Sequence, residues 1–164
     1  MGALHWSVSL GEVYEIESYQ PRKGVGHLLS RVRAEMLAAL DKAFEADAEL
    51  AAMEISSAQF IVIAALAMAE SAKSASDLCR HLSYDAGAMT RMIDRLESKG
   101  LIRRNRRPDD RRVVFVELTE AGSRAYPRMH VVSMAVANRF LRGFSHSEAR
   151  ELEGFLGRML ENAA

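Results

Sequence analysis

Positively charged side chains are concentrated in one short stretch of the chain. The segment from Asp85 to Arg112 holds nine lysines and arginines and five carboxylates, so its local charge is +4, although the whole chain has a formal net charge of zero. Six of the nine are arginines between Arg103 and Arg112. A segregated positive charge is typical of a nucleic-acid-binding surface, and the alternative is a solvated, arginine-rich hairpin without a ligand.

The stretch that begins at Asp85 is expected to form a helix with a small, partly basic face. Its apolar residues fall together on one side of an ideal helix: Ala88, Met89, Met92, Ile93 and Leu96. The candidate DNA contacts lie on or beside the other side: Ala86, Gly87, Thr90, Arg91 and Arg95. Small residues allow the helix backbone to approach DNA closely, Thr90 offers a hydroxyl, and Arg91 can bind guanine or a phosphate. Arg95 lies on the flank and is equally compatible with a plain surface charge. Asp94 would repel phosphate and is expected to pair with a nearby arginine.

Two β-type runs follow this helix. Gly100 stands where a helix-terminating glycine is expected. Residues 101–106 and 112–118 are predicted to be strands, and the turn residues 107–111 connect them. A helix of this kind beside an arginine-tipped hairpin suits a recognition helix in a DNA groove with a flanking wing.

Capping signals upstream predict the helices that must position this surface. Ser56 and Gln59 form a capping box ahead of residues 60–68, which are apolar on nearly all sides and should form a buried central helix. Ser74 and Asp77 repeat the signature and predict a short helix that a tight connection joins to the next one. Two short helices with a brief turn between them make a helix-turn-helix.

The N-terminal part is expected to carry an apolar arm and a long helix. Residues 1–21 contain Trp6, Tyr14 and Tyr19, and packing against a partner subunit is the economical way to cover them. From about Val25 to Asp47, apolar residues recur at spacings of three and four, which predicts the helix.

The C-terminal part is expected to be helical as well. Thr119 should begin a helix, and Pro127 should kink it or delay its regular part. Ser145 and Glu148 form a third capping box before the last helix, which is lined by Leu152, Phe155, Leu156, Met159 and Leu160.

Composition sets the broad class. With 164 residues, 49% hydrophobic and 27% charged, the chain is expected to be one ordinary globular domain. Cys79 is the single cysteine, so an intrachain disulfide is impossible, and a structural thiol is the favoured interpretation. The N-terminal residues do not have the pattern of a signal peptide, and no apolar run is long enough to predict a membrane span. A cytoplasmic location is therefore expected.

These residues resemble the MarR family of bacterial transcription regulators. The similarity is carried by Gly100-Leu-Ile-Arg-Arg, by Asp109-Asp-Arg-Arg112 and by Leu118-Thr-Glu-Ala-Gly122, with GAMTRMIDRLESKG before them as the recognition helix. It extends more loosely from about Gly24 to Asn162. The resemblance implies a dimer intertwined through its N- and C-terminal helices, bound to a pseudo-palindromic operator. Such proteins usually repress, and many release DNA when a small phenolic or other aromatic acid binds.

The resemblance also assigns roles within the hairpin. The Asp-x-Arg of the family's wing corresponds to Asp110 and Arg112, and a carboxylate two residues away can orient a guanidinium for a narrow minor groove. Arg107 and Arg111 are better placed for phosphates. The alternative for Asp110 and Arg112 is a hairpin salt bridge without a DNA role.

An effector site is harder to derive from the residues. His27 and Arg31 lie one helical turn apart and could receive a carboxylate, although a solvated face or an intersubunit salt bridge would explain the pair as well. The five histidines do not cluster with carboxylates or the cysteine, so neither a metal nor another cofactor is expected. No nucleophile–base pair or phosphate-binding glycine loop suggests an enzyme.

The resulting prediction is a mainly α protein with a small β-hairpin that binds double-stranded DNA as a homodimer. Residues 1–50 should form an arm and a dimerisation helix, residues 55–120 a winged helix-turn-helix, and residues 121–164 further dimerisation helices. The rival hypothesis is a winged-helix module that binds another protein and does not touch DNA.

Overall fold

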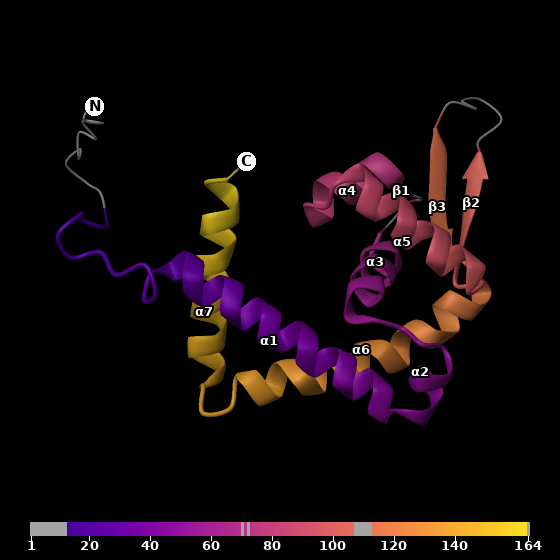
Figure 1. Cartoon of the computed structure of the whole chain (residues 1–164). Coiled ribbons are helices and arrows are strands. Elements are labelled where there is room, and N and C mark those ends of the chain that lie inside the picture. Colours follow the sequence, from indigo (N-terminus) through magenta and orange to yellow (C-terminus); the bar gives the residue numbers. More distant parts are fainter. Residues whose placement is uncertain (1–12, 70, 72, 107–112, 164) are drawn as a thin grey trace. The chain divides into compact units, whose positions relative to one another are not determined.

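The computed structural model describes residues 13–69, 71, 73–106 and 113–163. In chain order the elements are α1 (Val25–Ala46), α2 (Ala48–Ala52), α3 (Ser57–Ala67), β1 (Lys73–Ser74), α4 (Ala75–Leu82), α5 (Ala86–Ser98), β2 (Ile102–Arg106), β3 (Val114–Leu118), α6 (Glu120–Phe140) and α7 (His146–Glu161), as Figure 1 shows. The chain divides into two compact units, the first ending at Glu35 and the second beginning at Met36.

In the first unit the segment before α1 folds back on the start of that helix. The backbone N–H of Val25 donates to the hydroxyl of Tyr14 over 3.1 Å. The rings of Tyr14 and Tyr19 meet edge to face with centroids 4.8 Å apart. Tyr19 lies so close to Gly24 that a Cβ there would be 2.7 Å from its hydroxyl oxygen. Trp6 lies outside the described residues, and the expected packing of this arm on a partner stays a prediction.

All three capping boxes predicted from the sequence are confirmed. Ser56 caps α3 with Gln59, Ser74 caps α4 with Asp77, and Ser145 caps α7 with Glu148. In each box the serine side chain accepts from a backbone N–H, and the side chain three residues on accepts from the N-cap N–H, so two orphan donors of the first turn are satisfied.

The second unit is built around α3, which was expected to be central and buried. Four of its apolar side chains are buried: Phe60, Val62, Ile63 and Leu66. The helix packs against α4, α6 and β3. Its first turn is fixed by Asp41 of α1, whose carboxylate accepts from the backbone N–H and the hydroxyl of Ser57 at 2.6 and 3.0 Å. This core is the platform on which the helix-turn-helix and hairpin rest.

The predicted hairpin is confirmed, and it forms part of a three-stranded antiparallel sheet. Strands β2 and β3 pair as expected, but β1 joins the other edge of β3 to give the order β1-β3-β2. The register places Lys73 opposite Val116 and Ile102 opposite Leu118. Sequence analysis missed β1 because a two-residue strand shows no alternation. The five-residue helix α2, capped by Asp47, was missed as well.

The junction between β3 and α6 explains the glycine of the Leu118-Thr-Glu-Ala-Gly122 motif. The Thr119 hydroxyl donates to the Gly100 carbonyl, and its backbone N–H donates to the Leu101 carbonyl. Gly122 is buried against Leu101, the residue that precedes β2. A Cβ at Gly122 would lie 2.1 Å from the Leu101 carbonyl oxygen. Only glycine allows α6 to approach the Leu101 carbonyl this closely.

The expectation that Pro127 would delay the regular part of α6 is wrong. The helix runs continuously from Glu120 to Phe140 with Pro127 inside it. Proline removes one backbone donor and disfavours a helix interior. Here Ala125 and Met129 are buried on either side of it, so packing on the core offsets the lost bond.

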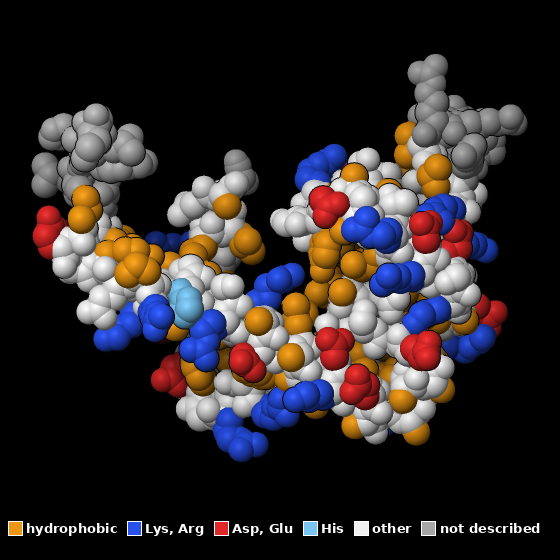
Figure 2. All heavy atoms as spheres, in the orientation of Figure 1, with side chains coloured by type: hydrophobic (Ala, Val, Ile, Leu, Met, Phe, Trp, Pro, Cys, Tyr) orange, Lys and Arg blue, Asp and Glu red, His pale blue; other side chains and the backbone are white. Residues whose placement is uncertain are grey.

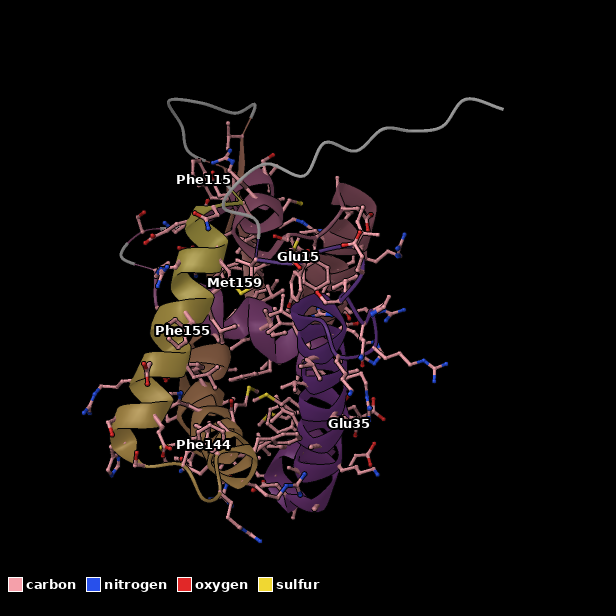
Figure 3. All side chains as sticks on the ribbon, turned by 90° about the vertical axis from the view of Figure 1, so that its left-hand side faces the viewer. Glu15, Glu35, Phe115, Phe144, Phe155 and Met159 are labelled. Carbon is pink, nitrogen blue, oxygen red and sulfur yellow. The ribbon has the colours of Figure 1, made fainter. Side chains whose placement is uncertain are left out.

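Helix α7 has no buried residue among those described. Its apolar stripe is exposed instead, with Leu152, Phe155, Met159 and Leu160 between 38% and 74% accessible. Figure 3 shows Phe155 and Met159 along one side of the helix and Phe144 at the corner that precedes it. None of the described helices is both long and apolar enough to cross a membrane.

Candidate nucleic-acid interface

Helices α4 and α5 form the predicted helix-turn-helix. Helix α4 ends at Leu82, and its C-cap Ser83 adopts the left-handed conformation with φ of 54°. The Tyr84 N–H donates to the Cys79 carbonyl over 3.1 Å. Asp85 then caps α5 by accepting from the Ala88 N–H over 2.8 Å. Three residues thus turn the chain between two helices that pack on one another.

The buried and exposed sides of α5 lie as predicted. Met89, Ile93 and Leu96 are buried, whereas the five candidate contacts are exposed: Ala86, Gly87, Thr90, Arg91 and Arg95. Figure 2 shows Lys and Arg side chains over the region of α4 and α5, with carboxylates between them. The apolar side anchors the helix and leaves the small and basic side free.

The first turns of α5 have little side-chain bulk. The Thr90 hydroxyl donates to the Ala86 carbonyl over 2.8 Å, and a hydroxyl that donates in this way can still accept a hydrogen bond. A Cβ at Gly87 would lie 3.5 Å from the Arg91 guanidinium and 3.2 Å from the Asp85 carboxylate. The Arg91 guanidinium therefore lies beside Gly87, at a distance that would be ordinary van der Waals contact for a Cβ there.

Asp94 is paired with an arginine, as expected, and Arg104 of β2 is that arginine. Its guanidinium donates to Asp94 and also to Glu97 one turn further along α5. The Glu97 carboxylate accepts the backbone N–H of Arg104 as well, over 3.0 Å. Partial burial alone would lower the pKa of Arg104, but the two carboxylates outweigh this effect and raise that pKa above its ordinary value.

The hairpin is described at its base. The side chain of Arg103 in β2 donates to Glu117 of β3 over 2.7 Å, and the Asn105 amide lies 3.5 Å from the same carboxylate. Four predicted site residues lie outside the described residues: Arg107, Asp110, Arg111 and Arg112. Their roles at the tip stay predictions.

The predicted effector pair belongs to the first unit. His27 and Arg31 are both exposed on α1.

Cys79 is half-buried and packs against the core, which fits a structural thiol. Over the described ranges, no group of three or more histidine, cysteine or acidic side chains is arranged to hold a metal ion.

Sequence reasoning missed the second half of the ion-pair network on β2. It foresaw a partner for Asp94 but neither the role of Glu97 nor the Arg103–Glu117 pair. The expected hairpin placed Arg103 and Glu117 in opposite strands. Because opposite charges on paired strands attract, this placement could have predicted the ion pair.

A helix-turn-helix followed by an antiparallel hairpin that packs on its second helix defines the winged-helix class. The MarR family model matches residues 55–114. The multiple antibiotic resistance protein MarR of Escherichia coli is 33% identical over 112 residues, which cover 68% of this chain and 77% of that protein. The chain belongs to the MarR family.

Other relatives match over different lengths. The uncharacterized HTH-type transcriptional regulator YdgJ of Bacillus subtilis is 35% identical over 89 residues, and the match spans about half of each chain, 54% of both. Among solved structures, wild-type E. coli MarR in its apo form aligns with a TM-score of 0.68 at 28% identity, covering 84% of this chain and 97% of that one. A cysteine-to-serine variant of the same protein, complexed with operator DNA, aligns with a TM-score of 0.71 at 28% identity, covering 83% and 93%.

Proposed function

We propose that this protein is a DNA-binding transcription regulator that inserts α5 into a major groove and its hairpin into the flanking minor groove. The observation that supports this most is the exposed face of α5, where small residues and Arg91 stand beside an Asp94 carboxylate that Arg104 already neutralises. Such a face can approach base edges and phosphates without a free carboxylate in the way. The similarity to a MarR variant that was solved with operator DNA supports the same docking.

We further propose that the protein acts as a homodimer on a pseudo-palindromic operator. Apolar side chains are exposed along α1 (Val25, Leu28 and Val32), α6 (Val131 and Met134) and α7, and exposed apolar helix faces commonly mark protein–protein interaction sites. In this arrangement residues 1–50 form an arm and a dimerisation helix, residues 121–164 form further dimerisation helices, and residues 55–120 form the DNA-binding lobe. Half-sites would then be centred about 10 base pairs apart.

Repression and release by a small phenolic or aromatic acid complete the proposal. His27 and Arg31, both exposed, would receive the carboxylate of such a ligand. Binding there would have to favour one spacing of the two recognition helices over another in order to alter DNA affinity.

A DNase footprint on the DNA upstream of the protein's own gene, repeated with a panel of aromatic acids, tests these proposals. We expect a protected region with two-fold related half-sites that at least one acid abolishes. Protection that none of the acids alters would contradict the proposed effector and would still support the DNA-binding function. An absence of protection at low salt would favour the rival hypothesis, a winged-helix module that binds another protein.

A further inference from the structure

We propose that Arg104 is a positioning residue of the DNA-binding surface: it ties β2 to α5 and neutralises Asp94 and Glu97 without touching DNA. The inference rests on the proposed DNA-binding function and specifies which arginine of the hairpin works through the protein. Its neighbour in the strand, Arg103, pairs with Glu117 of β3.

The geometry of Arg104 is that of an internal bridge. Strand residues alternate between faces, so Arg104 shares the α5 face of β2 with Ile102, which is buried. Its register partner across the sheet is Val116, also buried. The strand position that carries the guanidinium is therefore fixed by the core on one side and by α5 on the other.

Glu97 holds Arg104 through two different groups. One carboxylate oxygen accepts the backbone N–H over 3.0 Å, and the other accepts the guanidinium. The second guanidinium nitrogen donates to Asp94. A planar fork that joins two carboxylates requires arginine, because a lysine ammonium is a single point without this spread of donors.

Exposure separates this arginine from its neighbour. The Arg104 side chain is 31% accessible, whereas that of Arg103 is 66% accessible. Three of the donor groups of Arg104 are engaged within the protein, so it is poorly available to a phosphate. Its effect on DNA is indirect: it determines where the hairpin leaves α5.

The electrostatic consequence concerns the face that would meet DNA. Asp94 lies on that face and its side chain is 57% accessible. Without the Arg104 guanidinium, the negative charges of Asp94 and Glu97 would be uncompensated on the helix that carries Arg91 and Arg95, and these charges would repel phosphates. Because Arg104 compensates both carboxylates, the positive charges of the α5 arginines determine how this face attracts phosphates.

A double-mutant cycle with a matched control tests the proposal. Arg104→Gln and Arg103→Gln each remove one positive charge from β2, and thermal melts by circular dichroism establish that both variants stay folded. Binding is measured on a DNA duplex of about 30 base pairs from the footprinted region, long enough for two half-sites. We expect Arg104→Gln to weaken binding at least tenfold and Arg103→Gln less than threefold. In an Asp94→Asn/Glu97→Gln background, Arg104→Gln should cost less than threefold.

Two results would overturn this role. An equal loss from Arg104→Gln in both backgrounds would mean that Arg104 contacts DNA directly, as would a salt slope lowered by about one. Unchanged binding would mean that the bridge is dispensable. A readout without DNA tests the tie to α5: amides of β2 should exchange hydrogen faster in Arg104→Gln than in Arg103→Gln, and equal exchange contradicts the proposal. If wild-type protein fails to bind the duplex while β2 exchange still differs, the proposed function fails and the bridge stands.

Discussion

The winged helix-turn-helix buries its apolar side chains, whereas the terminal helices leave many of theirs exposed. In α3, α5 and the sheet, apolar residues such as Ile63, Met89 and Val116 are completely buried within one chain. In α7 a stripe of similar length is exposed, and α1 leaves Leu28 and Val32 accessible before it joins the second unit. The first region buries its own hydrophobic surface, whereas the second leaves apolar surface exposed, which is the surface that the proposed homodimer would cover.

The comparison indicates where stability and assembly reside. A substitution that disturbs the close packing of the helix-turn-helix region should unfold the protein. A substitution in the exposed stripe of α7 should dissociate the proposed dimer while each chain stays folded. Substitutions in the two regions can therefore be designed to separate unfolding from dissociation.

The largest effect is expected at Gly122. Gly122→Val would place a Cβ 2.1 Å from the Leu101 carbonyl oxygen, so α6 would have to move away from Leu101. We expect a loss of at least about 3 kcal/mol in the free energy of unfolding, measured by urea denaturation. Gly154→Ala in α7 is the control, because a Cβ there meets nothing within 4 Å, and it should be neutral or slightly stabilising. Equal stability of the two variants would refute the close-approach explanation.

The next largest effect concerns assembly. Phe155→Asp places a charge in the exposed stripe of α7 and should weaken the dimer at least about a hundredfold, which corresponds to about 3 kcal/mol. Sedimentation equilibrium measures the change, and the circular dichroism spectrum of the dissociated chain should stay helical. Gly154→Asp adds the same charge away from the stripe and should leave the dimer intact. A Phe155→Asp protein that remains dimeric would remove α7 from the interface.

A smaller effect is expected at the tip of the hairpin. Arg112→Ala should weaken operator binding at least tenfold, about 1.4 kcal/mol, while the dimer stays folded. Arg124→Ala is the control, because Arg124 is an exposed arginine that pairs with Glu120 on α6. A gel-shift assay at moderate salt compares them, and matching affinities for both variants would exclude the wing from the mechanism.

The smallest effect is a pH dependence of the second unit. Hydrogen bonding to Arg128 lowers the pKa of Asp47 below its ordinary value of 3.8, so the ion pair contributes stability above that value and loses it as the pH falls through the lowered pKa. Asp47→Asn keeps an N-cap for α2 and removes the charge. The variant should be less stable than wild type at neutral pH, and the difference should narrow below a pH of about 3.8. A difference independent of pH in urea denaturation would contradict this cause.

Local signals in the sequence predicted most of the helix-turn-helix region and the start of α7, because a capping box or a helical stripe needs only neighbouring residues. The three serine caps and the buried side of α5 are examples. What failed depended on distant parts of the chain. Strand β1 exists only because Lys73 meets Val116, and α6 continues through Pro127 because the core holds its neighbours. That Arg104 is the partner of Asp94 likewise follows from the return of β2 along α5.

The central claim, that the small and basic face of α5 and the hairpin bind DNA through several phosphates, is tested most directly by salt dependence. The dissociation constant of the wild-type protein for the footprinted duplex should be measured between about 50 and 200 mM salt. We expect the logarithm of the affinity to fall steeply and linearly with the logarithm of salt concentration, and Arg91→Ala to reduce the slope by about one if that side chain holds a phosphate. A flat response in the wild-type protein would contradict the account.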